Sequence, residues 1–206
     1  DSLTTINKWT FSGCTGLTAV TFPSTASLTT IEAGAFENCT RLTQLTFPTS
    51  LTSIKEGTFA FCTGLTSVSF PDSLTYTGRN AFSECTGLTS ITFPDGLSTI
   101  EDGAFYKCTG LTAVTFPDSL TTIRGSAFYG CIGLTSITFP NSLSTIEDSA
   151  FAGCTGLPSI TFPATASLTI IGEYAFEGCR GLPSVTFPDS LSTIGNNAFD
   201  GCIGLT

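Results

Sequence analysis

Two pairs of neighbouring carboxylates are, by residue type, the groups best suited to catalysis. Glu101 stands next to Asp102, and a similar pair recurs as Glu147 and Asp148. Two carboxyl groups can share general acid and base roles when a pocket separates their pKa values. Both pairs occupy equivalent positions of a repeating sequence, which predicts an exposed edge that offers no pocket. We therefore expect no catalytic residues and a protein that is not an enzyme.

Nine cysteines form the second group with potential chemistry. Successive cysteines lie 23 residues apart, except that the first and seventh steps are 25. A thiolate metal site needs clustered ligands at short spacing, and the chain has neither a CxxC motif nor a histidine. We favour buried free thiols, which pack as small apolar groups, with disulfides between neighbouring coils as the alternative. We predict no metal site and no cofactor. The cysteines are Cys14, Cys39, Cys62, Cys85, Cys108, Cys131, Cys154, Cys179 and Cys202.

A third candidate is a column of aspartates that each follow a proline. Asp72, Asp95 and Asp118 hold this place in three successive repeats, and Asn141 holds it in the next. Carboxylates about 5 Å apart in a stack would offer oxygen ligands to Ca²⁺. We favour an Asx-turn at each position, because other residues of this slot suit that turn equally well. Those residues are Ser24, Thr49 and Asp189.

One repeating unit positions all these residues, with the pattern L-x-x-[IV]-x-F-P-x-x-L-x-x-I-x-x-x-A-F-x-x-C-x-G. In residues 88–94 apolar and hydroxyl side chains alternate, which predicts a half-buried strand that Pro94 ends. Leu97 and Ile100 are expected to turn inward on the opposite wall, and Gly110 to make a turn with positive φ. A unit of this size cannot bury its own apolar face, so the units are predicted to stack as a solenoid.

Two columns of phenylalanine are predicted to form the core of this stack. Large side chains that recur once per unit lie above one another in neighbouring coils and shield each other from water. The first column is Phe11, Phe36, Phe59, Phe82, Phe105, Phe128, Phe151, Phe176 and Phe199. The second column is Phe22, Phe47, Phe70, Phe93, Phe116, Phe139, Phe162 and Phe187.

The L-x-x-[IV]-x-F-P strand and the A-F-x-x-C closure resemble the BspA-like, or Treponema-type, leucine-rich repeat family from Leu3 to Leu205. The resemblance implies a right-handed, curved, β-rich solenoid with a parallel sheet on its concave face. It would contain about eight to nine coils of 23 residues, two of them lengthened to 25. The family is usually carried on secreted or cell-surface proteins and associated with adhesion, and it has no catalytic residues to carry over. We expect residues 1–206 to be a single repeat domain and a fragment of a longer protein, because both ends fall within a repeat unit.

The charge of the chain argues against a nucleic-acid partner, and its hydropathy pattern argues against a membrane span. The formal net charge is −9, and the seven Lys and Arg residues are spread singly. Nucleic acid binding requires a basic stripe, and a membrane span requires roughly 18 consecutive apolar residues; the sequence contains neither. We predict no nucleic-acid partner and no membrane insertion of this segment.

The charged residues that follow each L-x-x-I segment alternate in sign between units. This alternation predicts ion pairs between neighbouring coils. One predicted set is Glu56, Arg79 and Asp102, and the other is Glu101, Arg124 and Glu147.

The outward-facing strand positions form the predicted binding surface, because solenoids commonly bind partners on an extended concave face. These side chains are small, hydroxylated and uncharged. We predict a noncatalytic extracellular or cell-surface module that binds protein or glycan in adhesion. Structural assembly through end-to-end self-association and ice binding through the Ser/Ala-x-Thr array remain as alternatives. Aromatic residues at other slots, such as Trp9, Tyr106 and Tyr129, are interpreted as ordinary exposed residues of the outer wall. The predicted binding residues are Gln44, Thr46, Ser67, Ser69, Ser90, Thr92, Thr115, Ser136, Thr138, Ser159 and Thr161.

Overall fold

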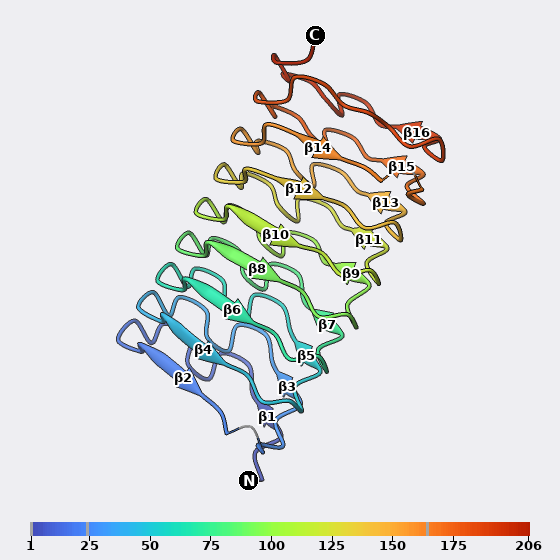
Figure 1. Cartoon of the computed structure of the whole chain (residues 1–206). Coiled ribbons are helices and arrows are strands. Elements are labelled where there is room, and N and C mark those ends of the chain that lie inside the picture. The colour runs from blue at the N-terminus through green and yellow to red at the C-terminus, as the bar shows by residue number, and fades with distance from the viewer. Residues whose placement is uncertain (1, 24, 164) are drawn as a thin grey trace.

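The computed structural model describes residues 2–23, 25–163 and 165–206 as a solenoid whose coils stack from the N-terminus to the C-terminus (Figure 1). These residues form sixteen short strands and no helix. The described residues therefore contain no helix long and apolar enough to cross a membrane. The predicted parallel β-solenoid is confirmed.

The first wall consists of strands that begin each repeat and pair in parallel with the coils on either side. Five of them form one sheet in the order β10-β8-β6-β4-β2, and β12 pairs with β14. A single bridge between Ala113 and Ser136 connects the two groups. The pairing is in register, so equivalent residues of successive coils stand side by side. The strands are β2 (Ala19–Thr21), β4 (Gln44–Thr46), β6 (Ser67–Ser69), β8 (Ser90–Thr92), β10 (Ala113–Thr115), β12 (Ile137–Thr138) and β14 (Ile160–Thr161).

A second wall of two-residue strands follows the proline turn of each coil. Leu97 and Ile100 are buried on this wall as predicted, but its strands were not predicted, because two residues carry no periodic signal. The second wall is divided into two sheets between β7 (Tyr76–Thr77) and β9 (Thr99–Ile100). At this break, Thr77 is fully buried, and its hydroxyl has no hydrogen-bond partner among the described residues. The strands of the second wall are β1 (Thr5–Ile6), β3 (Thr30–Ile31), β5 (Ser53–Ile54), β7 (Tyr76–Thr77), β9 (Thr99–Ile100), β11 (Thr122–Ile123), β13 (Thr145–Ile146), β15 (Ile170–Ile171) and β16 (Thr193–Ile194).

A third side of each coil, which we call the closing segment, runs from the Ala-Phe pair to the cysteine, as in residues 104–108. Its backbone forms a further ladder between coils: Phe82 N–H donates to Ala104 O at 2.9 Å, and Glu84 N–H donates to Tyr106 O at 2.7 Å. Residues two positions before and two after the phenylalanine adopt positive φ, including Lys107 at 53°. The closing segments are therefore hydrogen-bonded as regularly as the two strand walls.

The prediction of a positive φ at Gly110 is wrong. Gly110 is absent from the positive-φ residues of the chain, and the left-handed positions of its coil are Gly103 and Lys107. A Cβ atom at Gly110 would collide with the carbonyl oxygen of Thr86 in the preceding coil. Glycine is needed at this slot because two backbones approach closely.

The two phenylalanine columns are both present but differ in depth. In the first column the rings from Phe36 to Phe176 are at most 1 % exposed. They stack on one another, as between Phe82 and Phe105, whose centroids are 5.5 Å apart with an interplanar angle of 3°. Rings of the second column meet the first edge-on, as between Phe93 and Phe105 at 75°. Two of the central second-column rings, Phe70 and Phe116, are only partly buried.

Candidate binding surfaces

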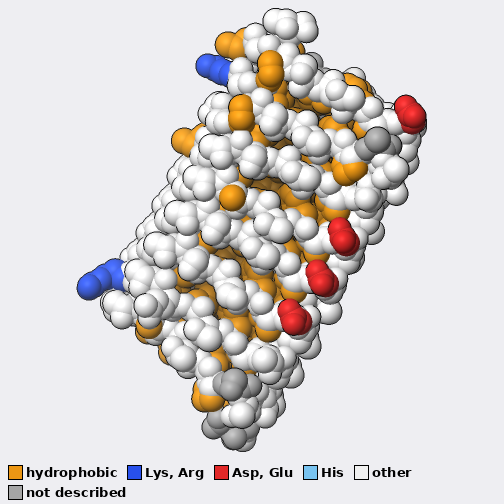
Figure 2. Space-filling view, in the orientation of Figure 1, with side chains coloured by type: hydrophobic (Ala, Val, Ile, Leu, Met, Phe, Trp, Pro, Cys, Tyr) orange, Lys and Arg blue, Asp and Glu red, His pale blue; other side chains and the backbone are white. Residues whose placement is uncertain are grey.

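The eleven predicted binding residues, from Gln44 to Thr161, are all exposed and lie together on the first wall. We call this surface the hydroxylated face. The register brings Ser67 beside Ser90, Ser69 beside Thr92, and Thr138 beside Thr161. Figure 2 shows that charged side chains lie only at the edges of this view, with a row of acidic groups along one rim and basic groups at the opposite edge.

The side chains of the hydroxylated face make no hydrogen bond within the part of the chain that the structure describes. Their immediate neighbours behave differently. Before four of the described strands, a threonine donates its hydroxyl to the backbone of the preceding coil, as Thr89 does to Thr66 O at 3.2 Å and Thr112 to Thr89 O at 3.0 Å. This threonine ladder was missed at the sequence level, although its recurrence after the first leucine of the repeat was the available signal.

The aspartate column lies along the rim of this face, with Asp72, Asp95 and Asp118 all exposed. The Asx-turn prediction is wrong: the turn is closed by the backbone, with Leu97 N–H donating to Pro94 O at 3.1 Å. The adjacent serine reaches across coils, as Ser119 Oγ donates to Leu97 O at 2.7 Å. Among the described residues no cluster of three acidic, Cys or His side chains fits a metal ion. Ser24, predicted to occupy the same turn, lies outside the described residues.

The opposite side of the solenoid carries the ion pairs between neighbouring coils that were predicted. Arg79 Nε lies 3.1 Å from Asp102 Oδ2, and Arg124 Nε lies 3.4 Å from Glu101 Oε2. Glu147, expected to pair with Arg124, instead accepts a hydrogen bond from the backbone N–H of Gly125 at 3.2 Å. The alternation of charge therefore fixes contacts between successive coils on this side.

The expectation that this edge has no pocket is wrong. An open cavity of about 690 Å³ is lined by Glu56, Arg79, Asp102, Glu147 and Asp148 among others. The lining carboxylates have structural partners, since Asp102 pairs with Arg79 and Asp148 Oδ1 accepts from Glu173 N–H at 2.7 Å. Sequence periodicity did not reveal the hollow, because its lining comes from several coils, from Glu56 to Gly172, and depends on how their side chains are placed relative to one another.

The cysteines form a row in the closing segments, and all nine are free thiols. Eight are buried as predicted, and each donates its S–H to the carbonyl of a phenylalanine in the preceding coil, as Cys85 does to Phe59 O at 3.1 Å. Burial raises the pKa of the Cys62 and Cys108 thiols to about 12. Cys14 is exposed, contrary to the prediction, because it lies in the first coil of the structure. The buried row holds its protons at neutral pH and is therefore unsuited to nucleophilic chemistry.

Comparison with known proteins places this geometry in a family. The model of the BspA-type leucine-rich repeat region, with six copies, matches residues 1–109 and 77–206. The Treponema pallidum leucine-rich repeat protein TpLRR is similar in structure, with a TM-score of 0.70 and 30% identity over 76% of this chain and 72% of that one. A leucine-rich cell surface protein of Faecalibacterium prausnitzii A2-165 has a TM-score of 0.60 and 25% identity over 98% of this chain and 76% of that one. No curated protein matches the sequence. The chain belongs to the BspA-type leucine-rich repeat family.

Proposed function

We propose that this chain is a noncatalytic binding module of a bacterial surface or secreted protein, and that the hydroxylated face binds an extended glycan or protein partner in adhesion. The family consists of repeat proteins, and the similar Faecalibacterium prausnitzii protein is described as a cell surface protein. The second observation supports an extracellular location.

The observation that carries the proposal is the row of unpaired polar side chains on the hydroxylated face. All eleven are exposed, and none makes a hydrogen bond to the described protein, while the adjacent threonine ladder is bonded. Hydroxyl groups both donate and accept hydrogen bonds. Their repetition about every 4.8 Å along the solenoid offers a regular set of donors and acceptors to a polymeric partner. The near absence of charge on this wall favours a polar, uncharged ligand surface over a strongly charged one.

Binding to an array of glycans and extracellular matrix proteins tests the proposal. For each partner that binds, the affinity is then measured for the double variant Ser90→Glu with Ser136→Glu, which adds two charges to the hydroxylated face. The control is Thr86→Glu with Thr155→Glu, which adds the same charge at exposed turns outside this face. We expect about a tenfold loss or more for the first variant and little change for the second. Equal affinity of all three proteins for every partner, or no binding anywhere on the array, contradicts the proposal.

A further inference from the structure

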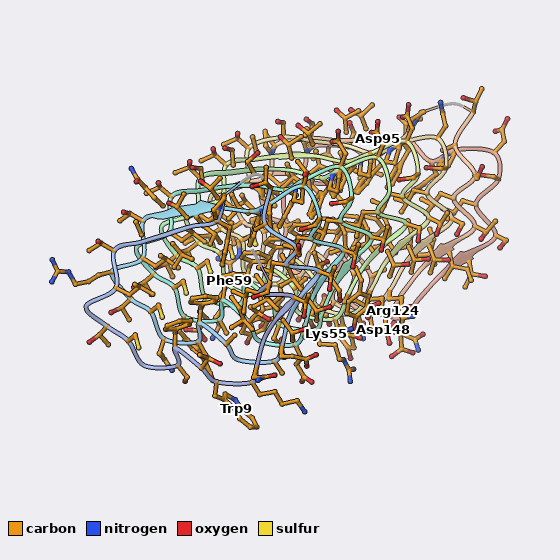
Figure 3. All side chains as sticks on the ribbon, turned by 90° about the horizontal axis from the view of Figure 1, so that it is seen from below. Trp9, Lys55, Phe59, Asp95, Arg124 and Asp148 are labelled. Carbon is orange, nitrogen blue, oxygen red and sulfur yellow. The ribbon has the colours of Figure 1, made fainter. Side chains whose placement is uncertain are left out.

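The side of the solenoid opposite the hydroxylated face contains two adjoining open cavities. A cavity of about 690 Å³ and a second of about 620 Å³ share Glu56, Asn80 and Tyr106 in their walls. Figure 3 shows Trp9, Lys55, Arg124 and Asp148 on this side of the solenoid and Asp95 on the other. We call the two joined cavities the acidic groove. It runs across several coils, from the first cavity wall at Ile170 to the second at Trp9.

The lining of the acidic groove is strongly unbalanced in charge. Among the described residues that line it are six carboxylates and one guanidinium, that of Arg79. Asp102, Glu147 and Asp148 have partners within the protein. The other three carboxylates make no ion pair or hydrogen bond in the described part of the chain, and they come from three successive coils. They are Glu37, Glu56 and Glu84.

Aromatic rings stand among these free carboxylates. Trp9, Phe61 and Tyr106 line the same cavity as Glu37, Glu56 and Glu84. Two rings of this side receive ammonium groups of the chain itself; Tyr106 lines the groove, whereas Tyr76 lies outside its lining. Lys107 Nζ lies 5.1 Å from the centroid of Tyr106, and Lys55 Nζ lies 5.0 Å from that of Tyr76. Both distances fall in the range of attraction between a cation and an aromatic face.

From these features we infer that the acidic groove binds an extended, lysine- or arginine-bearing polypeptide segment. Unpaired carboxylates attract the side-chain charge, and the neighbouring rings accept both its cationic head and its apolar stem. The free carboxylates come from three successive coils but from different positions of the repeat, since Glu37 follows Phe36, Glu56 lies three residues before Phe59 and Glu84 lies two residues after Phe82. An extended chain presents side chains to one face about every 7 Å, so two or more of its basic residues reach carboxylates of different coils. A neutral glycan would use the rings but leave the three charges uncompensated. The inference concerns a surface separate from the hydroxylated face and does not depend on the function proposed for that face.

The single tryptophan of the chain gives a direct readout, because Trp9 is 62 % exposed and lines the groove. An alternating Lys–Ala peptide is titrated into the protein while tryptophan emission is followed, with calorimetry as the independent measure of binding. We expect saturable binding that changes the emission and weakens with added salt, since exposed charges are screened. An alternating Glu–Ala peptide and a neutral oligosaccharide serve as ligand controls, for which we expect no binding.

Two variants with the same loss of charge locate the site. Glu56→Gln with Glu84→Gln removes two free carboxylates of the groove, and Asp95→Asn with Asp118→Asn removes two from the opposite rim. We expect the first to lower the affinity for the Lys–Ala peptide about tenfold and the second to change it less than about twofold. Circular dichroism checks that both variants fold.

Three results overturn the inference. Equal losses in the two variants show attraction to the net charge alone. Calorimetric binding without a change in Trp9 emission places the peptide elsewhere. A change in emission caused by the neutral oligosaccharide but not by the Lys–Ala peptide identifies the groove as a glycan site instead.

Discussion

The closing segments and the first strand wall belong to the same repeat but use their polar groups in opposite ways. In the closing segments, backbone N–H groups and thiols donate to neighbouring coils, and the central phenylalanines are at most 1 % exposed. On the first wall, the hydroxyls of the hydroxylated face make no hydrogen bond within the described residues, and Phe70 and Phe116 are only partly buried. The closing segments therefore bury their rings and pair their polar groups more completely than the first wall does.

Alkaline pH is expected to cause the largest decrease in the free energy of unfolding, because it titrates the thiols of the closing segments. Burial raises the pKa of Cys62, Cys108 and Cys179 from 9.0 to about 12. Between pH 9 and pH 12 the unfolded chain has lost thiol protons that the folded chain retains. The contribution of these thiols to the free energy of unfolding is therefore fully present below pH 9 and decreases as the pH rises toward 12. At about pH 10.5 each such thiol reduces the free energy of unfolding by about 2 kcal/mol. Urea unfolding followed by circular dichroism at pH 8 and pH 10.5 measures the loss.

Two cysteine variants test the origin of this alkaline loss. Replacing Cys62, Cys108 and Cys179 by Ala lowers stability at pH 8 but makes the decline above pH 9 shallower, because three titrating groups are gone. Cys14→Ser is the control and leaves the decline unchanged, since Cys14 is exposed. An equally steep decline in the triple variant contradicts the assignment to the buried thiols.

The next largest effect separates the two phenylalanine columns. Phe82 is fully buried, so Phe82→Ala is expected to lower the free energy of unfolding by about 3–5 kcal/mol. Phe116 is only partly buried, so Phe116→Ala leaves a smaller cavity and is expected to cost roughly half as much. Urea denaturation of both variants gives the difference. Equal losses would show that the strand wall contributes to stability as much as the closing segments.

The second wall provides an intermediate case, because its sheet is interrupted beside Thr77. The Thr77 hydroxyl is fully buried without a hydrogen-bond partner among the described residues, at a slot that holds isoleucine in neighbouring coils. Thr77→Ile removes an unsatisfied polar atom and adds apolar volume, so it is expected to raise the free energy of unfolding by about 1–2 kcal/mol. The reverse change, Ile100→Thr, is the matched control and is expected to lower it. A destabilised Thr77→Ile protein would mean that the site cannot hold the larger side chain.

Much of this division was predictable from the sequence. The period of the apolar residues predicted the coils, the two phenylalanine columns and the residues of the hydroxylated face, because each depends only on which positions recur. The second wall was missed because its two-residue strands are defined by pairing with other coils rather than by a pattern within one. Gly110 was misinterpreted because close approach to Thr86 and positive φ both require glycine. The acidic groove was missed because a hollow depends on the relative placement of side chains from several coils.

The smallest expected change in the free energy of unfolding comes from the hydroxylated face, and it tests most directly how this face differs from the closing segments. Thr92 and Thr115 are exposed on adjacent strands and make no side-chain hydrogen bond within the described protein. Thr92→Ala with Thr115→Ala should therefore change the free energy of unfolding by less than about 0.5 kcal/mol, as urea denaturation can determine. Thr89→Ala with Thr112→Ala is the matched control, since these hydroxyls donate to the preceding coils and their loss should cost about 0.5–1.5 kcal/mol each. If the first pair proves as costly as the second, the hydroxyls of the face contribute to folding, and their exposure no longer marks a surface kept for a partner.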